Sequence, residues 1–152
     1  MKVPEIVYWD SDCFLGWFQG EDGKVDHCAA SIERAEAGQL VLVTSALTIA
    51  EVLWMRNAPR IIAEKARIVR AFFKRPYIRV RNVTRLVAEA AQDLVWEKDV
   101  RPKDAIHVAT ALEAQVMAFE TFDEGLIKKS ETLGQGKLIV RKPRYLEQDK
   151  IN

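Results

Sequence analysis

Short apolar runs limit the folds open to this chain more strongly than any other feature of its sequence. Five of them occur, at residues 6–9, 40–43, 77–80, 116–119 and 138–140. Each has the length of a buried strand and is too short for a helix. The stretches between them fit helices over residues 12–18, 25–37, 45–55, 60–73, 83–98, 102–115 and 123–133. Gly38 and Gly134 directly follow two of these stretches, as expected where helices end.

Strands that alternate with helices predict an α/β fold. We expect a three-layer-like sandwich, in which helices flank a mainly parallel central sheet of four to five strands. The 152 residues suit a single domain over residues 1–152, with 141–152 as a C-terminal tail. No apolar stretch approaches the roughly 20 residues of a membrane helix, and the first residues lack the apolar core of a signal peptide. We therefore expect a cytoplasmic protein with no membrane partner.

Positive charge is concentrated in one segment of a chain that is nearly neutral overall. The whole sequence has 23 basic and 22 acidic side chains, a net charge of +1. Residues 56–85 hold ten basic residues and one acidic residue, a charge of +9, so the rest carries 1 − 9 = −8. On the helix predicted over 60–73 and its continuation, one face gathers Arg60, Arg67, Arg70 and Lys74. This stripe suits a nucleic-acid backbone, although a solvated face or contact with a partner's acidic tail would explain it as well.

Two aspartates come at or shortly after the ends of apolar runs. Asp10 directly follows the run at 6–9, and Asp123 comes four residues after the run at 116–119. Ligands of open α/β sheets bind at the carboxyl ends of the strands, so both positions favour a functional site. An aspartate at the start of a helix also caps it, which is the structural alternative for Asp10.

Glu51 and Asp104 complete the set of acidic candidates. On its predicted helix, Glu51 shares a largely apolar face with Leu47 and Trp54, so its charge requires a metal ion or an arginine unless it reaches water. Asp104 lies in the first turn of the helix that begins at Pro102, where capping is the alternative role. Carboxylates gathered in one place repel one another and need protons or a cation, and oxygen ligands favour Mg²⁺ or Mn²⁺.

Aromatic residues and one histidine are expected mainly in supporting positions. His107 lies one helical turn after Asp104, where a place in the core or behind the site is favoured over catalysis. The tryptophans are expected mainly in the core, with Trp17 as a candidate for stacking on a base; they are Trp9, Trp17, Trp54 and Trp96.

Four segments resemble, in order, the sequence motifs of PIN domains. They are Val7–Leu15, Thr44–Leu53, Lys103–Ala111 and Thr121–Leu126. The resemblance extends from residue 6 to about residue 140, and the chain length is similar to that of the VapC-like branch, the toxin ribonucleases of toxin–antitoxin pairs. It implies that the catalytic and metal-binding residues are Asp10, Glu51, Asp104 and Asp123, supported by Asp12 and Thr121. Asp12 is itself a departure, because PIN domains often have Asn or Ser at that position.

The resemblance also implies an activity and its partners. The activity is that of a Mg²⁺- or Mn²⁺-dependent endoribonuclease, which leaves 5′-phosphate and 3′-hydroxyl ends. Asp10, Asp104 and Asp123 would hold the metal, and Glu51 would bind it or orient the attacking water. The expected partners are an RNA substrate, a small antitoxin protein and a second copy of the chain in a homodimer.

Two other functions fit parts of the sequence. Asp10-Ser11-Asp12 has the Asp-x-Asp form of haloacid-dehalogenase-like phosphatases, in which Asp10 would be the nucleophile and Asp12 the general acid and base. That chemistry gives Glu51 no role, and the chain has no clear lysine motif for it. A catalytically inactive PIN-like domain that binds RNA or protein is the second alternative. The presence of all four acidic residues argues against it.

Overall fold

Five parallel strands form the centre of the molecule in our computed structural model, which describes residues 3–54 and 61–144. The strands are β1 (Glu5–Trp9), β2 (Leu40–Ser45), β3 (Ile78–Arg81), β4 (Ala118–Glu120) and β5 (Ile139–Arg141). Their order in the sheet is β3-β2-β1-β4-β5. The predicted parallel α/β architecture is therefore confirmed, with every pairing parallel.

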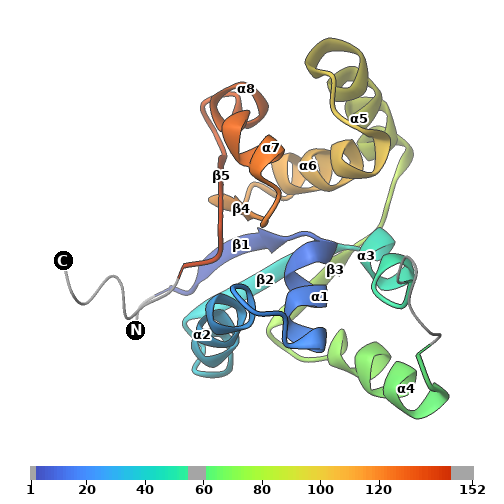
Figure 1. Cartoon of the computed structure of the whole chain (residues 1–152). Helices are drawn as coiled ribbons and strands as arrows, with labels where there is room; N and C mark the ends of the chain where they lie inside the picture. The colour runs from blue at the N-terminus through green and yellow to red at the C-terminus, as the bar shows by residue number, and fades with distance from the viewer. Residues whose placement is uncertain (1–2, 55–60, 145–152) are drawn as a thin grey trace.

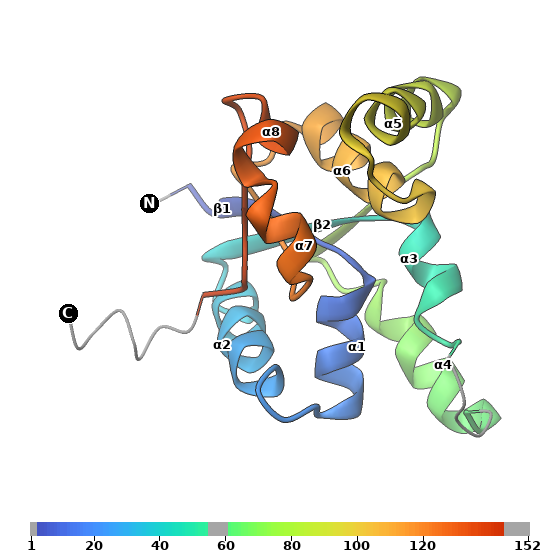
Figure 2. The same cartoon turned by 45° about the horizontal axis from the view of Figure 1, so that its top comes forward.

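Helices cover both faces of this sheet (Figure 1). In the described ranges they are α1 (Ser11–Gln19), α2 (Val25–Glu36), α3 (Ala46–Glu51), α4 (Ala63–Phe72), α5 (Arg85–Lys98), α6 (Pro102–Ala114), α7 (Glu124–Lys128) and α8 (Ser130–Gly134). Figures 1 and 2 show α1, α2 and α4 on one side of the sheet and α5 to α8 on the other. None of the helices in the described part of the chain is long and apolar enough to cross a membrane.

The central strand β1 explains why the apolar runs do not alternate with polar residues. Val7 and Trp9 belong to the core on the α1 and α2 side, whereas Tyr8 belongs to the core under α5 and α6. There the Tyr8 ring stacks on Phe119 of β4, with 5.1 Å between ring centroids. These last three residues of β1, Val7, Tyr8 and Trp9, are fully buried, as expected for a parallel strand covered on both faces.

The connection from β3 to β4 creates a switch point beside β1. The chain adds β2 and then β3 on one side of β1, and it returns through α5 and α6 to place β4 on the other side. The carboxyl ends of β1 and β4 consequently lie next to each other, since Trp9 pairs with Glu120. Crevices at such switch points are the usual ligand sites of open α/β sheets.

Three predicted boundaries differ from the structure. The single helix predicted over 123–133 is two helices, α7 and α8, because the chain turns at Lys129, whose amine donates to the carbonyls of Lys98 and Asp99 (3.2 and 3.1 Å). The helix predicted over 45–55 ends earlier: α3 stops at Glu51, and a turn follows in which the Trp54 N–H donates to the Glu51 carbonyl (3.1 Å). Arg141 of the predicted tail is the last residue of β5, while residues 145–152 lie outside the described ranges.

Candidate active site

Asp10 and Thr121 are held together where β1 and β4 end. Asp10 is the N-cap of α1, and its Oδ1 accepts a hydrogen bond from the Cys13 N–H (3.3 Å). Its Oδ2 accepts a hydrogen bond from the Thr121 hydroxyl (2.6 Å). Both side chains are buried, with Asp10 only 4% exposed. Asp10 therefore has the capping role considered from the sequence and also lies at the switch point.

The charge of Asp10 is poorly solvated. Burial, and next the negative charge of Asp12, raise the pKa of Asp10 from 3.8 to about 7, although the hydrogen bond from Thr121 opposes this. Burial is also the main cause of a raised pKa for Asp12, which Lys24 counteracts. Two neighbouring carboxyl groups with raised pKa values indicate an acidic site that a cation would stabilise.

Thr121 also connects Asp10 to Asp123. The hydroxyl that donates to Asp10 accepts a hydrogen bond from the backbone N–H of Asp123 (3.1 Å). Asp123 is in turn the N-cap of α7, since its Oδ1 accepts from the Leu126 N–H (3.1 Å). One buried threonine thus fixes the spacing of two acidic loops that are over a hundred residues apart in sequence.

Asp104 faces the same region from the first turn of α6. Burial raises its pKa, and the guanidinium of Arg101 opposes that shift. Arg101 lies between two acids: its Nε is 3.5 Å from Asp104 Oδ2, and its Nη2 is 3.7 Å from Asp123 Oδ2. Arg101 was not among the residues predicted for the site, although a cation three positions before Asp104 was a visible signal in the sequence.

Glu51 is paired with a histidine, where the sequence analysis considered a metal ion or an arginine. Its Oε1 lies 2.7 Å from Nε2 of His107, and Nδ1 of that ring lies 2.6 Å from the Tyr8 hydroxyl. A carboxylate only accepts hydrogen bonds, so we assign the proton to Nε2, and Nδ1 then accepts from Tyr8. His107 is 2% exposed and supports Glu51 from behind, as its predicted supporting position implies.

These acidic side chains gather at one cleft of about 490 Å³. It is lined by Ser11, Asp12, Glu51, Arg101, Pro102, Lys103, Asp104 and Asp123. Asp10, the residue before Ser11, is buried next to it. The structure thus brings all the acidic candidates to one region, from α1, α3, α6 and the loop before α7. Their catalytic roles remain predictions.

The acidic side chains of the cleft suit a hard divalent cation, because they offer carboxylate oxygens as ligands. Across residues 3–54 and 61–144, however, no group of three or more His, Cys, Asp and Glu side chains is arranged so as to hold a metal ion. Arg101 provides positive charge between Asp104 and Asp123 in this arrangement. The residues fit a divalent ion in their chemistry, and Arg101 lies beside the Oδ2 atoms of Asp104 and Asp123 that would take part in binding it.

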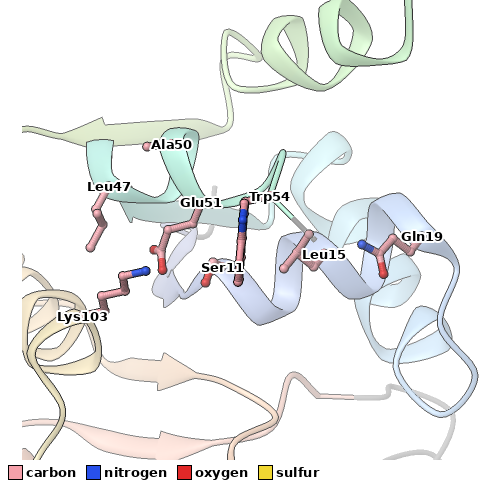
Figure 3. A pocket seen from close by; sticks show the side chains of 8 residues that line it. All are labelled: Ser11, Leu15, Gln19, Leu47, Ala50, Glu51, Trp54 and Lys103. Atoms are coloured by element: carbon pink, nitrogen blue, oxygen red, sulfur yellow. The ribbon is translucent and has the colours of Figure 1, made fainter. Parts of the chain in front are cut away.

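A second, more apolar cavity of about 730 Å³ adjoins the cleft (Figure 3). It is lined by Ser11, Leu15, Gln19, Leu47, Ala50, Glu51, Trp54 and Lys103. The expectation that Trp54 and Trp96 lie in the core is wrong, because they are 68% and 82% exposed. Trp17, the residue proposed for base stacking, instead packs against the core on the α1 side.

The predicted basic stripe lies outside both cavities. Arg67 and Arg70 on α4, and Lys74 just after it, are exposed, while Val69 and Phe72 on the opposite face are buried. None of the three basic residues lines the cleft or the second cavity. Arg60, the fourth member of the predicted stripe, lies outside the described residues.

Fold and site together define a class: a three-layer parallel α/β domain with an acidic cleft at its switch point. The family model of the PIN domain matches residues 7–131, and the chain belongs to this family. The resemblance drawn from the motifs is thereby confirmed. The match to the PIN family also decides against the haloacid-dehalogenase alternative. A comparison with curated proteins gives no match.

Several solved structures share the fold at low sequence identity. VapC20 of Mycobacterium tuberculosis, described as a sarcin–ricin loop cleaving toxin, has a TM-score of 0.60 and 19% identity, over 77% of this chain and 89% of that one. A toxin–antitoxin complex from Klebsiella pneumoniae has a TM-score of 0.58 and 18% identity, over 88% and 95%. FitAcB from Neisseria gonorrhoeae has a TM-score of 0.57 and 16% identity, over 90% and 97%. The chain therefore shares the fold of these three structures.

Proposed function

We propose that this protein is a Mg²⁺- or Mn²⁺-dependent endoribonuclease and the toxin of a toxin–antitoxin pair. The observation that carries the proposal is the convergence of five acidic side chains from distant parts of the chain on one cleft. They are Asp10, Asp12, Glu51, Asp104 and Asp123. Asp10 is buried and the other four are half-buried, and gathered carboxylates repel one another, so their convergence favours a catalytic role over a structural one.

Each residue has a role that follows from its surroundings. Asp10, Asp104 and Asp123 would hold the divalent ion, which when bound supplies the positive charge that activates water and polarises the phosphate. Thr121 keeps Asp10 and Asp123 at a fixed spacing. Glu51, with one oxygen held by His107, keeps the other to orient the attacking water or to join the ligands. Asp12 adds a further carboxylate at the cleft.

The substrate and partners are proposed from charge and from the structural neighbours. Arg101 and Lys103 at the rim of the cleft provide cations for an incoming phosphate backbone. One neighbour is described as cleaving the sarcin–ricin loop, and another as a toxin–antitoxin complex. We accordingly propose an RNA substrate, a small antitoxin partner, a homodimer and a cytoplasmic location.

The test is cleavage of RNA by the purified protein with Mg²⁺ or Mn²⁺ and with a chelator. We expect cleavage only with metal, and a loss of at least about a hundredfold in Asp10→Asn and Asp123→Asn. Asp93→Asn, at an exposed position on α5, is the control and should cleave as the wild type does. Expression in cells should arrest growth for the wild type and the control alone.

The same experiment decides between an enzyme and an inactive binding domain. The inactive binding domain is supported if the protein binds RNA but does not cleave it with either metal. In that case the wild type and Asp10→Asn should also arrest growth equally. Cleavage that continues undiminished in Asp10→Asn and Asp123→Asn would overturn the assignment of the site.

A further inference from the structure

An apolar groove beside the acidic cleft has no role in the hydrolysis proposed above. The groove is formed by Leu15, Leu47, Ala50 and Trp54, from α1, α3 and the turn after α3. Three further residues, Ser11, Glu51 and Lys103, line both the groove and the acidic cleft. The two are therefore parts of one continuous depression, and whatever enters the groove lies next to the reacting group.

Trp54 is the most unusual residue of this groove. Its side chain is 68% exposed, although an indole is among the groups that gain most from burial. Figure 3 shows the ring of Trp54 near Leu15 and Ser11 of α1, facing the space between α1 and α3. An accessible flat ring next to an aliphatic side chain is a surface on which a nucleobase stacks.

Lys103 lies where the groove meets the cleft. It is exposed, forms no ion pair with the residues of the described ranges, and directs its amine toward Glu51 (Figure 3). A free cation at this junction matches a phosphate group that links a nucleotide in the groove to one in the cleft. Along the depression the apolar ring of Trp54 comes first, then the amine of Lys103, then the carboxylates of the cleft. This order matches a base, the phosphate next to it and the phosphate that is hydrolysed.

We propose that the groove binds one unpaired base of a single-stranded RNA, next to the scissile phosphate. Trp54 stacks on this base, and Lys103 contacts the intervening phosphate. The inference rests on the proposed function, and it adds to that function a subsite for one base, formed by residues of α1, α3 and the turn after α3. A base within a duplex is already stacked and paired, so it is not available to Trp54.

Binding of a labelled single-stranded RNA oligonucleotide tests the groove without requiring cleavage. We expect Trp54→Ala to raise Kd about tenfold or more, and Trp54→Phe to retain much of the affinity because it retains a ring. Trp96→Ala is the matched control, since Trp96 is still more exposed and lies on α5 outside the groove. A fully base-paired RNA of the same length should bind the wild type and Trp54→Ala equally.

An abasic residue moved along the oligonucleotide locates the base. At one position of the abasic residue, the wild type should bind the abasic RNA as weakly as Trp54→Ala binds the intact RNA. Trp54→Ala should bind this abasic RNA and the intact RNA with equal affinity. In cleavage assays Trp54→Ala should raise KM with little change in kcat, since the ring does not touch the reacting atoms.

Separate outcomes overturn this inference and the proposed function. If the wild type cleaves RNA and Trp54→Ala has the same Kd and KM, the base site is wrong and the groove is left for a segment of a protein partner. If the wild type cleaves no RNA but Trp54→Ala loses oligonucleotide binding, the base site stands and the nuclease assignment fails.

Discussion

Tyr8 supports Glu51 through His107, in a chain of hydrogen bonds that runs from the core to the cleft. We predict that Tyr8→Phe lowers the free energy of unfolding by about 1–2 kcal/mol, because Nδ1 of His107 loses its hydrogen bond from the Tyr8 hydroxyl. RNA cleavage should fall as well, through kcat more than KM, because Glu51 is held less firmly. Chemical denaturation and steady-state kinetics measure the two effects.

Tyr77→Phe is the control for this prediction. The Tyr77 hydroxyl is buried and has no hydrogen-bond partner among the described residues, so its removal should leave stability unchanged or slightly increased. Equal losses of stability in the two variants would show that the hydrogen bond to His107 contributes nothing.

Asp10 makes stability depend on pH in a direction opposite to that of most carboxyl groups. Since burial raises its pKa from 3.8 to about 7, the folded protein holds this proton more tightly than the unfolded chain does. The resulting stabilisation is complete below the unfolded pKa and is lost as the pH rises through about 7. Without divalent ions, we expect Asp10→Asn to be more stable than the wild type at about pH 8, by at most about 4 kcal/mol, and little different at about pH 4.

Urea unfolding in the presence of a chelator measures this difference, with Asp93→Asn as a control that should follow the wild type. Addition of Mg²⁺ at the higher pH should stabilise the wild type and have little effect on Asp10→Asn. A difference that does not change with pH would contradict the buried charge at Asp10.

At the scale of elements, the start of α6 carries the cations of the cleft. Lys103 faces both the cleft and the groove, so we predict that Lys103→Gln weakens RNA binding severalfold. The slope of log Kd against log salt concentration should decrease by about 0.7, the value for one phosphate contact with a single strand. Lys128→Gln is the control, because Lys128 is exposed on α7 and lines neither cavity. An unchanged slope in Lys103→Gln would exclude contact with phosphate.

At the scale of the whole molecule, α4 carries positive charge on its exposed face, next to α1 on the same side of the sheet (Figure 2). If RNA extends from the cleft over α4, Arg67→Gln combined with Arg70→Gln should weaken binding of long RNA and lower the salt slope by about 1.4. A short oligonucleotide that fills only the cleft should bind unchanged. The double variant Lys128→Gln and Lys137→Gln removes the same charge elsewhere and is the control. If the two double variants weaken RNA binding equally, Arg67 and Arg70 make no specific contact with RNA.

The sequence by itself determined the elements and the candidate acids. Five short apolar runs became five strands, and the runs are clearest in β1 and β2, because strands covered on both faces need mainly apolar side chains. Asp10 and Asp123 were recognisable because each comes after a strand and caps the next helix, so their positions are set by their neighbours in the chain. These properties depend on residues close together in the chain, so they can be predicted from the sequence.

Only the tertiary structure decided which distant groups meet. The sheet order places β4 next to β1 and so joins Thr121 to Asp10, and α6 is packed so that His107 reaches Glu51 and Tyr8. The exposure of Trp54 was equally unpredictable, because an apolar residue after a helix is buried only if another element covers it. The helical or strand period of a sequence fixes the direction in which a side chain points from its own helix or strand. Which residues that side chain contacts depends on how helices and strands pack together, and the local sequence period does not encode this packing.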